Sequence, residues 1–166
     1  MADTATYDKI ATQTLASAAA SITFSSIAAS WTDLRLVVVH LDSDTSNNFL
    51  RFNGDSGTNY SATYLYGNGT SASSFSITNR AYSDLGPITG STTVPMLANI
   101  DIFSYAGSTY KTTLTRLSED YNGTGATSNI VTLWRNTSAI TSIVIGRTGG
   151  TYSTGTTATL YGIKSA

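Results

Sequence analysis

The longest apolar run of the chain is LRLVVVHL, residues 34–41. In an extended strand successive side chains point to opposite faces of the sheet, so alternate residues of this run share a face. One face carries Leu34, Leu36, Val38 and His40. The other face, which is half apolar as well, carries Arg35, Val37, Val39 and Leu41. A strand that is apolar on both faces is expected in the middle of a sandwich or beneath a subunit contact.

Similar period-two alternation recurs along the chain, between segments rich in Gly, Asn, Asp and Ser that favour tight turns. The predicted strands are Tyr7–Leu15, Ala20–Phe24, Leu34–Leu41, Phe49–Phe52, Ala72–Ile77, Val94–Tyr105, Tyr110–Leu117, Ile130–Trp134, Ile140–Ile145 and Ala158–Ile163. The stretch Tyr60–Gly67 has a helical pattern instead, and it is the one helix that the sequence suggests.

Many short strands at this spacing predict an all-β fold, a single-domain antiparallel β-sandwich. A jelly roll is the expected topology, and a Greek-key sandwich of another topology is the alternative. Residues 1–9 are expected to form an N-terminal arm, because chain ends stay mobile unless they dock. Residues 10–166 are expected to form the single β-sandwich domain, which is long enough to enclose a hydrophobic core.

The composition excludes several classes of function. Charged residues make up 11% of the chain, less than half of the usual share of about 25%. The formal net charge is −1 and no basic stripe is present, so a nucleic-acid partner is not expected. The absence of cysteine excludes disulfides and thiolate metal sites. No apolar run could span a bilayer and the start, MADTATYDKI, lacks the pattern of a signal peptide, so we expect synthesis in a cytoplasm and no membrane partner.

Residues 54–57 read GDSG, which resembles the segment around the nucleophilic serine of chymotrypsin-like proteases. Those enzymes place their histidine first and most of a barrel between it and the serine. The single histidine, His40, lies too close in sequence to Ser56 for that arrangement, and Thr58 follows where the proteases carry a second glycine. The segment Asn53–Gly57 is therefore expected to be a turn with its glycines at positive φ. We predict no catalytic residue and no enzymatic activity.

His40 stands at the end of an apolar strand face, where a hydrogen-bonded structural histidine is expected. The following loop, LDSDTSNNF at residues 41–49, carries oxygen ligands of the kind that Ca²⁺ uses. The candidate ligands are Asp42, Asp44, Asn47 and Asn48. The loop lacks the glycine and terminal glutamate of an EF-hand, and Asx-rich hairpin loops are common without a metal. No metal or cofactor is therefore predicted.

Paired carboxylates for glycoside hydrolysis could come from Asp101, Glu119 and Asp120, but no spacing argues for such a pair. Glu119 and Asp120 are expected to lie in a solvated loop.

Aromatic side chains could provide stacking platforms for sugars. Tyr60, Tyr64 and Tyr66 follow the GDSG turn closely and form the candidate sugar-binding cluster. Trp31 and Trp134 are expected to pack at sheet edges rather than to be displayed to solvent.

Several stretches are together similar to one group of proteins. They are YDKIATQTLASAAASITFSSI (7–27), WTDLRLVV (31–38), LRFNGDSGTNYS (50–61), YGNGT (66–70), LWRNTSAITSIVI (133–145) and TLYGIKSA (159–166). They resemble small virion structural proteins of tailed bacteriophages, including cyanophages and other aquatic phages, over nearly the whole chain. The most specific pieces are FNGDSGTNYS and TLYGIK. The resemblance implies a jelly-roll-like β-sandwich in the phage particle, either as a capsid decoration (cement) protein or in a tail adhesion device, and it carries no catalytic motif.

Low charge and hydroxyl-rich strands suit such a virion protein, made in the cytoplasm of the host bacterium and released by lysis. The first hypothesis is a capsid cement protein, whose partners would be the major capsid protein and its own copies, as a homotrimer. The second is a receptor-binding domain of a tail or fibre that recognises host glycans. The third is a free-standing carbohydrate-binding module or an accessory domain of an enzyme.

Overall fold

The computed structural model describes residues 6–42, 46–86 and 91–164, which form two antiparallel β-sheets and, within these ranges, no helix. The larger sheet has eight strands, in the order β1 (Tyr7–Thr14), β12 (Thr157–Ile163), β3 (Asp33–His40), β8 (Met96–Phe103), β9 (Lys111–Asp120), β10 (Gly125–Trp134), β5 (Tyr60–Gly67) and β6 (Ala72–Arg80). The smaller sheet has four strands, in the order β2 (Ser21–Phe24), β11 (Ile143–Arg147), β4 (Asn48–Phe52) and β7 (Ser83–Asp84). The predicted all-β sandwich is therefore confirmed.

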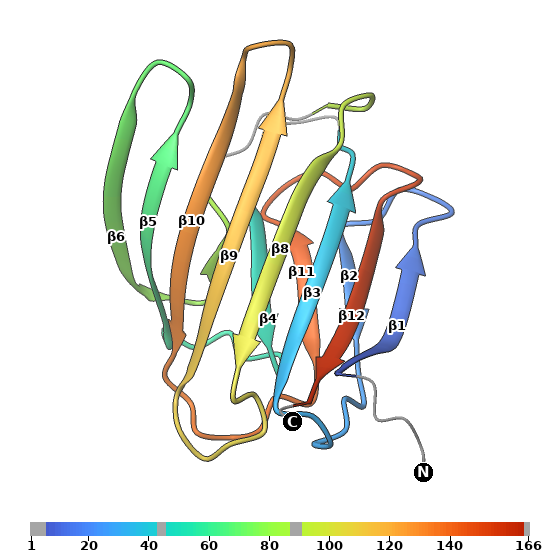
Figure 1. The fold of residues 1–166 in the computed structure, drawn as a ribbon, viewed down its shortest axis with the longest axis vertical. Helices are drawn as coiled ribbons and strands as arrows, with labels where there is room; N and C mark the ends of the chain where they lie inside the picture. Colours follow the sequence, from blue (N-terminus) through green and yellow to red (C-terminus); the bar gives the residue numbers. More distant parts are fainter. Residues whose placement is uncertain (1–5, 43–45, 87–90, 165–166) are drawn as a thin grey trace.

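The two sheets pack face to face, with the large sheet in front of the small one in Figure 1. Their facing sides form one hydrophobic core, to which β3 contributes Leu34, Leu36 and Val38, all of them inaccessible to solvent. His40 continues the same buried face, as the alternation of residues 34–41 predicted. β3 lies inside the large sheet, between β12 and β8, and its outer face, which carries Val37 and Val39, is half-buried to exposed.

The segment Tyr60–Gly67, predicted as a helix, is the strand β5, so this prediction was wrong. β5 pairs with β10 on one side and with β6 on the other. Tyr60 and Tyr64 lie four residues apart, a spacing that fits a helical period as well as the period of a strand. The burial of Tyr60, Ala62 and Tyr64, each separated by a more exposed residue, identifies the strand period.

Several strand boundaries differ from the predicted ones. Glu119 and Asp120, expected in a solvated loop, are the last residues of β9, and Glu119 is buried. The predicted strand Ile140–Ile145 begins later, at Ile143, and the short strand β7 was not predicted. Residues 7–9 of the predicted arm belong to β1 and pair with β12, so the sheet begins inside that segment, whereas residues 1–5 lie outside the described part.

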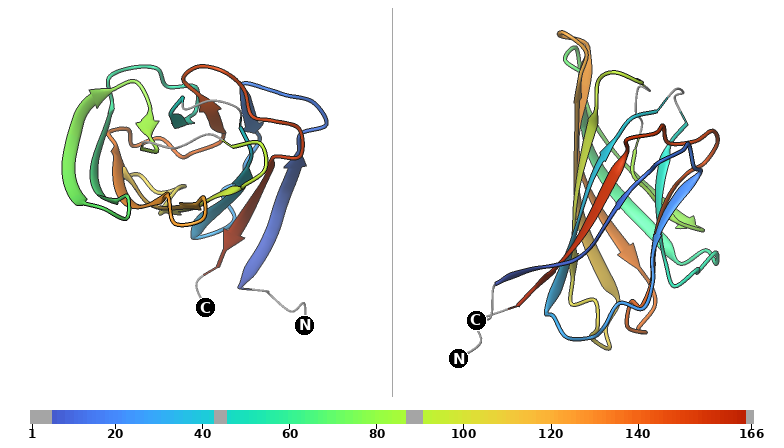
Figure 2. Two further views of the ribbon diagram at one scale, coloured as in Figure 1. Left: turned by 90° about the horizontal axis from the view of Figure 1, so that it is seen from above. Right: turned by 90° about the vertical axis from the view of Figure 1, so that its right-hand side faces the viewer.

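The first and last strands run side by side as the β1–β12 ribbon. Lys164 donates its backbone N–H to the carbonyl of Thr6, which extends the pairing of these strands to the ends of the described chain. Both views of Figure 2 show this ribbon reaching beyond the body of the sandwich. No helix within the described ranges is long and apolar enough to cross a membrane.

The large sheet extends further than the small one on the side of β5 and β6. Figure 2 (left) shows this end of the large sheet curving towards the side of the small sheet. β6 is the last strand of its sheet, and every one of its residues is exposed or half-buried. On its inner face Phe75 is 43% exposed, although its cross-strand neighbour Tyr64 is only 2% exposed.

Candidate functional site

The GDSG segment is a turn, as predicted, but of its two glycines only Gly54 has the predicted positive φ, and Gly57 does not. The N–H of Asp55 donates to the carbonyl of Phe52 at 2.9 Å, and Asn53 and Gly54 between them have φ of 52° and 67°. Positive φ at both central residues is the signature of a type I′ turn, which here ends β4 before the chain crosses to β5 in the large sheet. The Asp55 carboxylate accepts hydrogen bonds from Gly57 N–H (2.8 Å) and from the Trp134 indole (2.7 Å). Asp55 therefore links the turn to the buried side chain of Trp134.

Ser56 and His40 lie at opposite ends of the sandwich. The His40 imidazole is 3.1 Å from the side-chain amide of Asn48, at the start of β4. The turn that carries Ser56 follows Phe52, at the other end of β4. A strand rises by about 3.3 Å per residue, so the four steps along β4 separate these ends by roughly 13 Å. The histidine cannot act as a base for this serine.

We expect Ser56 to remain unlabelled by a fluorophosphonate probe, because His40, the single histidine of the chain, lies at the other end of β4 and cannot activate its hydroxyl. Ser56 is exposed, so Ser56→Ala should change the free energy of unfolding by less than about 0.5 kcal/mol. Intact mass spectrometry after probe treatment and urea unfolding of both proteins measure these outcomes. Labelling of the folded protein that disappears on unfolding would contradict the prediction.

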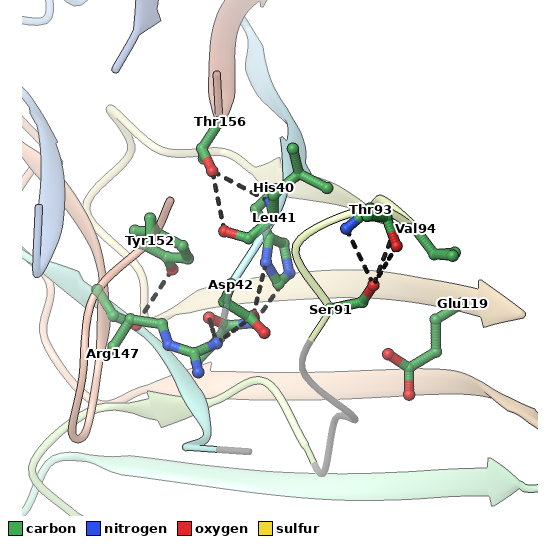
Figure 3. A network of polar contacts seen from close by, with 12 residues as sticks. His40, Leu41, Asp42, Ser91, Thr93, Val94, Glu119, Arg147, Tyr152 and Thr156 are labelled. Atoms are coloured by element: carbon green, nitrogen blue, oxygen red, sulfur yellow. Dashed lines mark hydrogen bonds and ion pairs between the residues drawn. The ribbon is translucent and has the colours of Figure 1, made fainter. Parts of the chain in front are cut away.

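A buried polar cluster closes the end of the sandwich that His40 occupies (Figure 3). Arg147 donates to the Asp42 carboxylate at 2.5 Å, and His40 Nδ1 lies 3.1 Å from the same carboxylate oxygen. The side chains of all three are at most 2% exposed. The His40 and Arg147 side chains also lie against the ring of Tyr152. Because β3 belongs to the large sheet and β11 to the small one, the cluster joins the two sheets, and His40 has the predicted structural role.

The candidate calcium ligands do not converge on one point. Asp42 faces the guanidinium of Arg147, which also approaches the Asn48 side-chain oxygen at 3.4 Å. Asn47 instead directs its amide towards Asp84, at 3.4 Å. Asp44 lies outside the described residues. Within the described ranges no group of three or more His, Cys, Asp or Glu residues could hold a metal ion.

The three tyrosines of the predicted sugar-binding cluster are not displayed together. Tyr60 is fully buried and stacks with Trp134, whose ring lies in the core rather than at a sheet edge. Tyr64 is buried as well, and its hydroxyl donates to the backbone carbonyl of Asp84 at 2.8 Å. Tyr66 is half-buried. The exposed aromatic ring in this region belongs to Phe75, which the sequence did not single out as a site residue.

A cavity of about 290 Å³ opens where the inner face of β5 and β6 meets β7. Its lining residues are Asn47, Tyr64, Phe75, Ile77, Arg80, Asp84 and Gly86. This cavity, called here the β6 pocket, combines aromatic and aliphatic side chains with an amide, a carboxylate and a guanidinium. Such a mixture is typical of sites that bind small molecules.

The outer face of the large sheet, which faces the viewer in Figure 1, is a second candidate surface. Four large apolar side chains on it are more than a third exposed, namely Val39, Leu65, Phe103 and Val131. Between them lies a polar group in which the Asp101 carboxylate forms ion pairs with Arg35 Nε at 2.5 Å and with Arg116 Nη2 at 3.4 Å. A contiguous exposed apolar patch is typical of surfaces that contact other proteins, and Leu65 and Val131, diagonal neighbours on the paired strands β5 and β10, are close enough to form one.

Comparisons with protein-family models, with curated proteins and with solved structures give no match, so the function of the chain has to be inferred from its own geometry.

Proposed function

We propose that this chain is a structural protein of a tailed-bacteriophage virion, and specifically a capsid decoration protein that binds the assembled shell and stabilises it. The observation that carries the proposal is the outer face of the large sheet. This face combines exposed apolar side chains with hydroxyl-bearing ones and only a few charges, and such a composition suits a protein contact more than a solvated surface.

We also propose that the sandwich is a jelly roll. In that topology four antiparallel strand pairs are wound so that successive pairs alternate between two sheets. The pairs β1–β12 and β3–β8 in the large sheet, and β2–β11 and β4–β7 in the small one, support this assignment. The hairpins β5–β6 and β9–β10 are then insertions that extend the large sheet alone.

The partners in this proposal are the major capsid protein and further copies of the chain, arranged as a homotrimer on the shell. The apolar band on β5 and β10, with Leu65 57% and Val131 48% exposed, is the part that we expect to touch a neighbour. Its contacts would be apolar and hydrogen-bonded, so attachment should survive moderate salt, unlike a contact that depends on charge. The proposed role is non-enzymatic and requires neither a metal nor a nucleic acid.

Particles stripped of this protein are expected to rupture at a lower temperature than complete particles. A protein that binds the assembled shell, but not the free capsid subunit, stabilises the shell by the free energy of that binding. Adding back the wild-type protein should restore the rupture temperature, while Val131→Glu should not. Release of DNA to a fluorescent dye during heating measures the effect.

The matched control is Thr58→Glu, which adds the same charge to an exposed loop away from the outer face and should restore stability fully. Mass-spectrometric quantitation of complete particles should give a copy number on the scale of the major capsid protein. Unchanged rupture temperature after stripping, together with lost adsorption to host cells, would contradict the decoration role.

Unchanged rupture temperature together with lost adsorption would favour the alternative function, a receptor-binding domain of the tail or fibre. The β6 pocket is the observation that supports it, because its mixed aromatic and polar lining suits a small ligand. A copy number far below that of the capsid protein would distinguish this role from decoration.

A further inference from the structure

The β6 pocket exists because the two sheets differ in width. β7, at the edge of the small sheet, is only two residues long and pairs with β4 alone. It covers the inner face of β10, where Ser83 and Thr132 bring their hydroxyls to 2.8 Å, but among the described residues the small sheet has no strand beyond it to cover β6. The residues that the structure describes therefore leave the inner side of β6 partly exposed, with Phe75 43% accessible to solvent.

An aromatic pair forms the apolar side of the pocket. The rings of Tyr64 and Phe75 stack across β5 and β6 with centroids 4.4 Å apart and an interplanar angle of 11°. The bond from the Tyr64 hydroxyl to Asp84 fixes the inner ring, and burial raises the pKa of Tyr64, so this hydroxyl stays protonated as a donor. Phe75 rests on that fixed ring and remains 43% exposed, while Ile77 extends the apolar surface.

Hydrogen-bond acceptors and donors line the opposite side of the pocket. One oxygen of the Asp84 carboxylate accepts the Gly86 N–H at 2.8 Å, which holds the carboxylate in place. The other oxygen receives only the long 3.4 Å contact from Asn47 among the described residues, so it retains capacity to accept a further hydrogen bond. The Arg80 guanidinium donates one hydrogen bond to the Tyr82 hydroxyl at 3.3 Å. It carries several further N–H donors that a ligand could use.

Gly86 allows the wall of the pocket to lie close to the core. Its φ of +89° is in the region that favours glycine, and a Cβ there would approach Ile130 at 3.4 Å. The backbone can therefore turn immediately after Asp84, which places the carboxylate and the Gly86 N–H on the same side of the pocket.

We propose that the β6 pocket binds one neutral sugar ring. A sugar presents a face of C–H groups, which suits the Phe75 ring, and a rim of hydroxyls that each donate and accept hydrogen bonds. Asp84 can accept from such hydroxyls, while Arg80 and Asn47 can donate to them. The carboxylate and the guanidinium cancel in net charge, so the pocket favours an uncharged ligand over an acidic sugar. The volume of about 290 Å³ is at the lower end of small-molecule sites and suits a single ring.

The experiment is an NMR titration of the full chain, uniformly labelled with ¹⁵N. The probes are the methyl glycosides of D-glucose, D-galactose, D-mannose and N-acetyl-D-glucosamine, with N-acetylneuraminic acid as the acidic comparison. We expect millimolar binding of at least one neutral sugar, with amide shifts concentrated at Phe75, Ile77 and Gly86. Phe75→Ala should weaken that binding about tenfold or more, and Asp84→Asn should weaken it as well.

The matched control is Phe103→Ala. Phe103 is 42% exposed, almost the same as Phe75, but it lies on the outer face of the large sheet, so its loss should leave sugar binding unchanged. Circular dichroism and melting curves verify that each variant is folded, and the exposed position of Phe75 makes its replacement tolerable.

Absence of amide shifts with every neutral sugar at tens of millimolar would overturn the proposal. Binding that Phe75→Ala leaves intact, or tighter binding of N-acetylneuraminic acid than of every neutral sugar, would overturn it equally. The pocket and the outer face are different surfaces, so shell stabilisation and sugar binding can fail independently of each other.

Discussion

Replacing Arg147 with alanine is expected to destabilise the protein by about 3–5 kcal/mol, because the change removes the cation that faces a buried carboxylate. Asp42, which is 2% exposed in the intact protein, would lose this cation and keep the His40 imidazole as its side-chain partner among the described residues. Breaking a buried ion pair on one side costs more than the pair itself contributes, since the remaining charge is left desolvated. Urea unfolding at neutral pH, followed by circular dichroism, measures the loss.

Arg116→Ala is the matched control, because it removes the same side-chain type from an exposed contact. Arg116 is 57% exposed and lies 3.4 Å from Asp101, which keeps Arg35 as a second partner. Exposed ion pairs contribute up to about 1 kcal/mol, so this variant should lie within that range. If both variants lost the same stability, the buried cluster would not have the role that we assign to it.

Trp134→Ala is expected to destabilise the protein by about 3–5 kcal/mol, the usual cost of removing a fully buried aromatic side chain. Its ring is inaccessible to solvent and packs against Phe52 at a centroid distance of 5.4 Å and against Tyr60 at 6.2 Å. Tyr110→Ala removes an aromatic ring that is 54% exposed and should have a much smaller effect. Equal losses in the two variants would contradict the central place of Trp134 in the core.

Trp134→Phe removes the indole N–H but keeps an aromatic ring in the core. The pH dependence of the unfolding free energy of this variant therefore reports the hydrogen bond from the indole to Asp55. Burial disfavours the ionised form of Asp55, but hydrogen bonds from Trp134, Asn59 and Gly57 outweigh it, so the pKa of Asp55 lies below its ordinary value. A depressed pKa in the folded state contributes stability above the unfolded pKa of about 4, and this stability is lost as the pH falls through the folded value.

The wild-type protein should therefore lose stability on acidification below about pH 4, and Trp134→Phe should flatten that dependence, because Asp55 loses one of its donors. Unfolding by urea at a series of pH values for both proteins provides the comparison. An unchanged slope in the variant would show that the Trp134–Asp55 bond does not influence the ionisation of Asp55.

The sequence predicted the β-sandwich because local alternation determines which face of a strand is buried. Residues 34–41 illustrate this, since burial of alternate side chains was read correctly as far as His40. Tyr60 and Tyr64 were misread because a spacing of four residues fits both a helix and a strand. The pairing of β5 with the adjacent strand β6 and with the distant strand β10 distinguishes the two.

The candidate site was harder to predict because it depends on contacts between distant residues. Nothing local indicates that Asp55 meets Trp134, or that Asp42 meets Arg147. Phe75 lay inside a predicted strand, but its exposure results from the unequal widths of the two sheets. Lys111 is a further example of a residue whose surroundings depend on distant contacts. It is fully buried, and its ammonium donates to the carbonyls of Gly107 (2.7 Å) and Thr137 (3.3 Å). No pattern in the sequence indicates this burial.

The order of strands has a consequence for how the chain is synthesised. β12 is synthesised after β1 and β3, between which it lies, and β11 is synthesised after its neighbours β2 and β4. Each sheet therefore lacks an interior strand until β11 and β12 have been translated, and until then the edge of β3 that pairs with β12 has no partner. An unpaired strand edge is prone to intermolecular association, so the nascent chain is most exposed to aggregation before these two strands emerge.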